Sequence, residues 1–225
     1  MASTGPAHLR IAVASEQSLV CEAVRAALTE RGLVVSVLRW TGERVPSPRS
    51  AATRRLDVGL IISDLDRWNR LQAVALLMTT IRLPWVVLTG AERGPLWGAA
   101  AEFGARTVLS SDTPLVVVQD ALLAAFRGES LLPREEVELL RASWQELRHE
   151  RQQLNERVRS LTPREREVLR LLYAGDSVAQ IADIFEVSPT TVRSQVKAVL
   201  RKLDVKSQLA AVAAFGHLME LDGAR

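Results

Sequence analysis

The sequence predicts an α/β domain with a doubly wound parallel sheet, then an all-α helix-turn-helix domain, joined by a long helix. Three observations support this. Short apolar runs alternate with helical patterns through residues 1–132, residues 133–160 are helical in pattern throughout, and amphipathic helical patterns fill residues 161–225. A length of 225 residues leaves room for one medium and one small domain.

The first domain is predicted from the order of its segments. Strands are expected at 9–14, 33–38, 58–63, 85–89 and 107–109. Helices are expected at 19–30, 71–81, 96–103 and 115–127, and a loop with at most a short helix at 41–55. Residues 58–62 carry no polar side chain, which is typical of a strand buried on both faces. Strands that alternate with helices form a parallel sheet, and ligands bind at the carboxyl ends of its strands.

The connecting segment contains no Gly or Pro between residues 135 and 161, and its apolar side chains recur at steps of three and four. This spacing favours a coiled-coil seam that pairs two chains, and the alternative is a helix packed on its own first domain. The residues expected at the dimer contact are Val137, Leu140, Trp144, Leu147, Leu154 and Val158.

Three helices are predicted in the C-terminal domain up to residue 203. Thr162, followed by Pro163 and Glu165, forms the pattern of a capping box at the start of the first helix. A short helix at 178–185 follows, and Ser188 is the expected N-cap of the third. Helix, short helix, tight turn and helix in this order indicate a helix-turn-helix.

The third helix has an apolar stripe on one side and cations on the other. The segment 188–206 contains five basic residues and one acid, and it holds all three lysines of the chain. Its outer side carries Thr190, Arg193, Ser194, Lys197 and Arg201. Such a surface fits the major groove of double-stranded DNA, although a basic helix face is often no more than a solvated surface.

Residues 161–212, LTPREREVLRLLYAGDSVAQIADIFEVSPTTVRSQVKAVLRKLDVKSQLAAV, resemble the DNA-binding domain of LuxR/FixJ-type regulators, the family that includes the NarL response regulators. The resemblance implies that Arg193, Ser194 and Lys197 reach base edges, with Thr191 and Lys202 near phosphates. Gln195 stands where the family most often has His, and Gln208 where Arg is common. The expected DNA-binding residues are Thr190, Thr191, Arg193, Ser194, Gln195, Lys197, Arg201 and Lys202.

Region 4 of a sigma factor begins with a similar helix and turn. The predicted fourth helix, 207–221, favours the LuxR type, because that domain packs and dimerises with such a helix.

The succession of strands and helices ahead of this domain resembles the receiver of a response regulator, a flavodoxin-like fold. By this resemblance Asp64 is the candidate phosphoacceptor and Thr89 matches the family's Thr or Ser. Ser15 and Glu16 replace the acidic pair that holds Mg²⁺, and Ser111 replaces the Lys. Because phosphoryl transfer depends on the metal and that Lys, we expect a degenerate receiver.

The sequence therefore predicts a transcription regulator that binds double-stranded DNA as a homodimer without phosphorylation and is not an enzyme. RNA polymerase is a further candidate partner. The alternatives are a conventionally phosphorylated response regulator and a receiver-fold sensor of proteins or small ligands. A flavodoxin-like enzyme is disfavoured because no Gly-rich phosphate loop is present. The single Cys21, three scattered histidines and absent signal region predict a cytoplasmic protein without disulfide, cofactor, metal or membrane contact.

Overall fold

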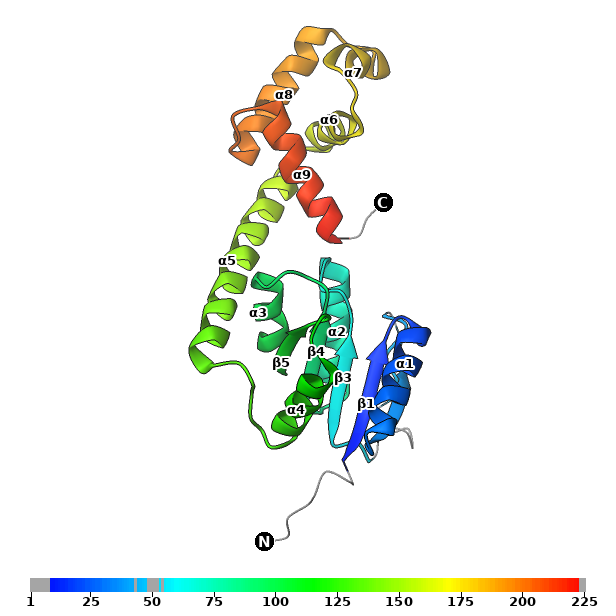
Figure 1. Cartoon of the computed structure of the whole chain (residues 1–225). Helices are drawn as coiled ribbons and strands as arrows, with labels where there is room; N and C mark the ends of the chain where they lie inside the picture. The colour runs from blue at the N-terminus through cyan, green and yellow to red at the C-terminus, as the bar shows by residue number, and fades with distance from the viewer. Residues whose placement is uncertain (1–8, 43, 48–52, 54, 223–225) are drawn as a thin grey trace. The chain divides into compact units, whose positions relative to one another are not determined.

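The computed structural model describes residues 9–42, 44–47, 53 and 55–222. The chain divides into two compact units, Met1–Gln145 and Glu146–Arg225 (Figure 1). The boundary lies inside the connecting helix and not at either end of the expected 133–160 linker.

The first unit contains a five-stranded parallel sheet with the strand order β2-β1-β3-β4-β5, which confirms the doubly wound fold. Its strands are β1 (Arg10–Ser15), β2 (Val34–Arg39), β3 (Val58–Ile62), β4 (Trp85–Thr89) and β5 (Ala105–Ser110). Its helices are α1 (Ser18–Glu30), α2 (Trp68–Thr80), α3 (Pro95–Glu102) and α4 (Leu115–Phe126). Helix α2 begins three residues before the expected position, and β5 extends beyond the expected segment at both ends.

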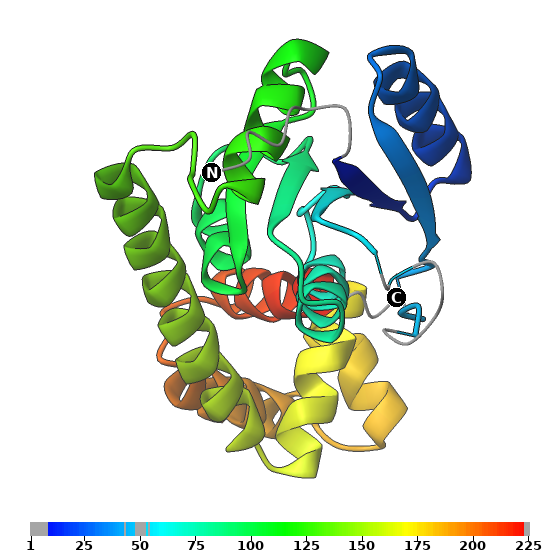
Figure 2. The ribbon, with the colours of Figure 1, turned by 90° about the horizontal axis from the view of Figure 1, so that it is seen from below.

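Helices cover both faces of the sheet (Figure 2). Helices α1 and α4 share one apolar core with the sheet, which includes Ile11, Leu60 and Leu122. Helices α2 and α3 contact each other on the opposite face. The central strand β3 is buried on both faces as predicted. The loop expected at 41–55 lies partly outside the described residues, and its described positions form no helix or strand.

The second unit is helical and contains two small apolar clusters. Besides the end of α5 (Arg134–Arg159), its helices are α6 (Pro163–Ala174), α7 (Val178–Phe185), α8 (Pro189–Leu203) and α9 (Gln208–Asp222). One cluster joins α6, α7 and α8, and the other joins α6, α8 and α9. The helix-turn-helix order is confirmed. None of the helices in the described part of the chain is long and apolar enough to cross a membrane.

Part of the expected dimer seam on the connecting helix α5 packs within single units of the chain. Trp144 is 1% exposed, and its ring lies 5.2 Å from that of Trp68 and 6.2 Å from that of Phe103, all in the first unit. A Cβ built on Gly98 of α3 would lie 1.9 Å from the carbonyl oxygen of Leu140, so the two helix backbones touch. Val158 packs against the core of the second unit. These parts of the apolar stripe are therefore used within single units, and Trp144 is not free to pair with a second chain.

Candidate nucleic-acid interface and acidic site

Side-chain caps and left-handed turns fix the geometry of the helix-turn-helix. Thr162 and Glu165 form the predicted capping box of α6, and Ser177 and Gln180 form a second one at α7. Ser188 Oγ accepts the Thr191 N–H at the start of α8. Between α7 and α8, Glu186 takes the left-handed conformation with φ 54°, which turns the chain within a few residues.

Helix α8 is held by its apolar side. Val192, Val196 and Val199 are buried, and they pack against α6, α7 and α9. The opposite side is exposed and carries the predicted residues Thr190, Arg193, Ser194, Lys197 and Arg201. Packing therefore fixes which side of the helix faces outward.

The exposed side carries an uncompensated row of cations. Arg193, Lys197 and Arg201 follow one another at steps of four, so they lie along one edge of the helix. Within the described residues, no carboxylate forms an ion pair with any of the three. Ser194 Oγ donates to the Thr190 carbonyl, 3.1 Å away. This row can offer charge and hydrogen-bond donors to an anionic partner.

Residues 159–215 match the family model of bacterial regulatory proteins of the luxR family. The C-terminal unit is a LuxR-family DNA-binding domain. The chain is accordingly a DNA-binding transcription regulator of the LuxR/NarL type.

Known proteins resemble this LuxR-type chain over different lengths. The glycerol metabolism activator of Pseudomonas putida is 24% identical over 213 residues, which cover 93% of this chain and 96% of that protein. The nitrate/nitrite response regulator NarL of Escherichia coli K12 is 34% identical over 112 residues, half of each chain. A structure of the two-component response regulator RcsB in complex with DNA is 20% identical, with a TM-score of 0.43 over 93% of this chain and 98% of that one.

Two of the predicted DNA-binding residues of α8, Lys202 and Gln195, are less exposed than the others. Lys202 Nζ donates to Glu165 Oε2 at 2.7 Å and to the Ser160 carbonyl at 3.3 Å, so it holds α8 to α6. The Gln195 amide oxygen is buried with no hydrogen-bond partner in the described structure, so that oxygen is turned away from solvent. The DNA contacts expected of Lys202 and Gln195 stay predictions, and in this structure both side chains are half-buried.

The ion pair between Lys202 and Glu165 was not predicted from the sequence. The hydrogen bond from Lys202 is the main cause that lowers the pKa of Glu165, and two hydrogen bonds from Thr162 lower it further against the effect of desolvation. Glu165 thus accepts from the α6 cap and from α8 at once.

The predicted receiver residues meet at the carboxyl edge of the sheet. Asp64 Oδ1 accepts the Gly90 N–H at 3.1 Å. Thr89 Oγ1 is buried and accepts from the N–H groups of Leu65 and Ala91, at 2.9 and 3.1 Å. Ser111 N–H donates to the Thr89 carbonyl at 2.8 Å. Thr89 therefore holds the loops after β3 and β4 together.

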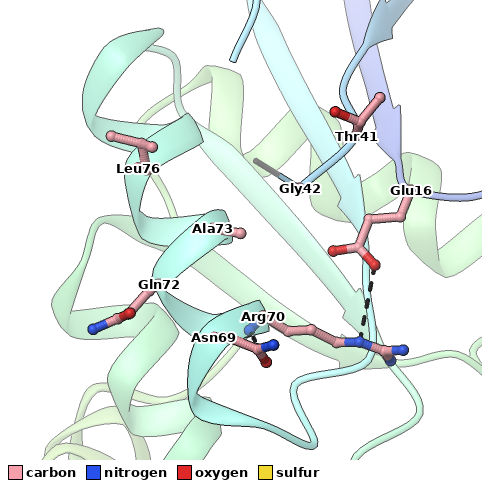
Figure 3. Close-up of a pocket in the computed structure, with 8 residues that line it drawn as sticks. All are labelled: Glu16, Thr41, Gly42, Asn69, Arg70, Gln72, Ala73 and Leu76. Atoms are coloured by element: carbon pink, nitrogen blue, oxygen red, sulfur yellow. Dashed lines mark hydrogen bonds and ion pairs between the residues drawn. The ribbon is translucent and has the colours of Figure 1, made fainter. Parts of the chain in front are cut away.

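The other two predicted positions follow β1. Ser15 is buried, and its hydroxyl accepts the Gln17 N–H at 3.2 Å. Glu16 lines a cavity of about 400 Å³ together with Thr41, Asn69 and Arg70 (Figure 3). Only Glu16 therefore brings a charge from this strand end.

Arg70, in the first turn of α2, was not among the predicted site residues. Its guanidinium lies 3.3 Å from Asp66, 3.6 Å from Asp64 and 3.9 Å from Glu16, measured between the charged atoms (Figure 3 draws the pair with Glu16). Among the described residues, no three His, Cys, Asp or Glu side chains are grouped so that they could hold a metal ion. The Mg²⁺ that the receiver resemblance implies does not fit, because the Arg70 guanidinium already lies among these carboxylates and Ser15 supplies no charge.

Proposed function

We propose that this transcription regulator reads DNA sequence with the outer side of α8, binds as a homodimer, and does so without phosphorylation. The observation that supports base reading is the row of Arg193, Lys197 and Arg201, which is exposed and lacks partner carboxylates among the described residues. Arg and Lys in a major groove contact guanine edges and phosphates. Two copies of such a short helix would read two half-sites about 34 Å apart.

Three features support independence from phosphorylation. Ser111 stands in place of the Lys, Ser15 supplies no carboxylate, and Arg70 lies among the remaining acids. A receiver transfers a phosphoryl group only with a metal and a cation that offset the developing charge. Asp64 instead accepts a backbone hydrogen bond from Gly90.

The experiment first selects bound duplexes from a random pool and then measures affinity for the selected operator at several salt concentrations. Arg193→Ala and Lys197→Ala should each weaken specific binding by about 1–3 kcal/mol. The matched control is Arg170→Ala, an exposed arginine of α6 that pairs with Glu167 and should leave operator affinity unchanged. Unchanged affinity in both α8 variants would show that α8 is not the reading helix.

Phosphorylation and assembly are tested on the same operator. Acetyl phosphate with Mg²⁺ should not change operator affinity, and Asp64→Asn should bind like the parent. A phosphoryl adduct that disappears in Asp64→Asn and tightens binding would identify a conventional response regulator. Sedimentation of the complex should give two chains on a duplex with two half-sites, and one chain would refute the dimer.

A further inference from the structure

The acidic edge of the sheet contains its own cation. Glu16 follows β1, and Asp64 and Asp66 follow β3, so the three carboxylates come from two loops that are distant in sequence. Arg70 approaches all three from the start of α2, with separations of 3.3 to 3.9 Å. Its side chain is 35% exposed, so water screens these pairs only in part.

We propose that Arg70 takes the place of a divalent cation in this domain and keeps the acidic edge closed to metal. The inference rests on the proposed phosphorylation-independent function and gives it a physical cause. A guanidinium remains charged at every accessible pH and presents several donors in one plane, so it can serve carboxylates from different loops at once.

Both oxygens of Asp64 are engaged in this arrangement. Arg70 lies near Oδ2, and the Gly90 N–H donates to Oδ1. A Cβ built on Gly90 would lie 2.8 Å from Asp64 Oδ1, so a larger residue there would displace the Asp64 carboxylate. A divalent ion would have to enter beside a positive charge at ion-pair distance, where like charges repel.

The test measures Mn²⁺ binding to the full chain. Binding is detected by electron paramagnetic resonance as a loss of the signal of the free ion. The parent should take up no Mn²⁺ at millimolar concentration. The three carboxylates are not grouped as a metal site while Arg70 lies among them. Arg70→Gln leaves them uncompensated and free to close on an ion, so this variant should bind Mn²⁺ at least tenfold more tightly than the parent. In the double variant Arg70→Gln with Asp64→Asn, the gain should be lost, which would assign the ion to this edge.

Two controls separate this effect from a general change in charge. Arg67→Gln removes a neighbouring cation that, among the described residues, pairs with Asp66 alone, at 3.8 Å, and should not create Mn²⁺ binding. Arg70→Lys keeps the charge and should exclude Mn²⁺ like the parent. Circular dichroism of each variant shows that the sheet is folded.

Equal Mn²⁺ binding by parent and Arg70→Gln, or an equal gain in Arg67→Gln, would overturn the inference. These results do not depend on DNA. DNA binding that is independent of acetyl phosphate, without a gain of Mn²⁺ binding in Arg70→Gln, would refute the role of Arg70 alone. A gain of Mn²⁺ binding together with DNA binding that depends on acetyl phosphate would refute the proposed function alone.

Discussion

Replacing Lys202 with Met is expected to destabilise the C-terminal unit and to leave its contact with DNA intact. The ammonium group lies 2.7 Å from the Glu165 carboxylate, and the side chains of Lys202 and Glu165 are only 29% and 12% exposed. Met keeps most of the aliphatic length, so the substitution removes mainly the charge and its hydrogen bonds. Glu165 would keep the Thr162 N–H at 2.7 Å but would lose its only ion pair among the described residues.

The size of the effect follows from this geometry. A hydrogen bond between charged groups contributes about 1.5–3 kcal/mol, whereas an exposed ion pair contributes about 0–1 kcal/mol. The partial burial of this pair places the expected loss near 2 kcal/mol. For a unit of this size, such a loss lowers the unfolding midpoint by roughly 10 °C. Differential scanning calorimetry of the full chain measures it, and Glu165→Gln completes a double-mutant cycle.

The pH dependence supplies a second measurement. The folded-state pKa of Glu165 lies below its usual value of 4.5, so the stabilisation is present above that pH and is lost as the pH falls through the lowered pKa. The difference in unfolding free energy between parent and Lys202→Met should therefore be full at pH 7 and shrink below pH 4.5. An unchanged midpoint, with a salt slope of operator binding flatter by about 0.9, would instead make Lys202 a phosphate contact.

Two further substitutions test contacts inside the first unit. Thr89→Ala should lower the unfolding free energy of the first unit by about 1–3 kcal/mol, because the buried N–H of Leu65 and that of Ala91 lose their acceptor. Chemical denaturation measures this loss, and Thr89→Ser, which keeps the hydroxyl, should retain most of the unfolding free energy. Gly98→Val should separate α5 from α3, since a Cβ there would overlap the Leu140 carbonyl, and limited proteolysis should then cleave α5 faster; an unchanged rate would refute the close helix contact.

The sequence was sufficient for the order of elements because that order depends on local patterns. The apolar run 58–62 became the buried strand β3, and Thr162 with Glu165 formed the expected capping box. Alternation of strands and helices then left few possible topologies. These signals depend on neighbours within a few residues, which a single sequence displays directly.

The acidic edge could be predicted only in part. Asp64, Thr89 and Ser111 were identified through the resemblance to a receiver, and they lie at the carboxyl ends of β3, β4 and β5, which meet at one edge of the sheet. No local sequence pattern identifies Arg70 as a site residue, because its partner Glu16 is 54 residues earlier and a long side chain can point in several directions. The stripe of α5 was ambiguous for a related reason, since the same apolar residues serve a partner chain or the chain's own domain.

The lower exposure of Lys202 and Gln195 on α8 follows from helix geometry. At about 100° per residue, Lys197, Thr190, Arg201 and Ser194 all fall within about 100° of Arg193 around the helix axis. The buried stripe of Val192, Val196, Val199 and Leu203 falls at roughly 240–300° in the same count. Lys202 and Gln195 fall at about 180° and 200°, on the flank beside the core. A cation on that flank lies beside the neighbouring helix, as Lys202 does beside Glu165 of α6. Position around the axis, more than residue type, therefore separates the proposed reading residues from those that hold the domain together.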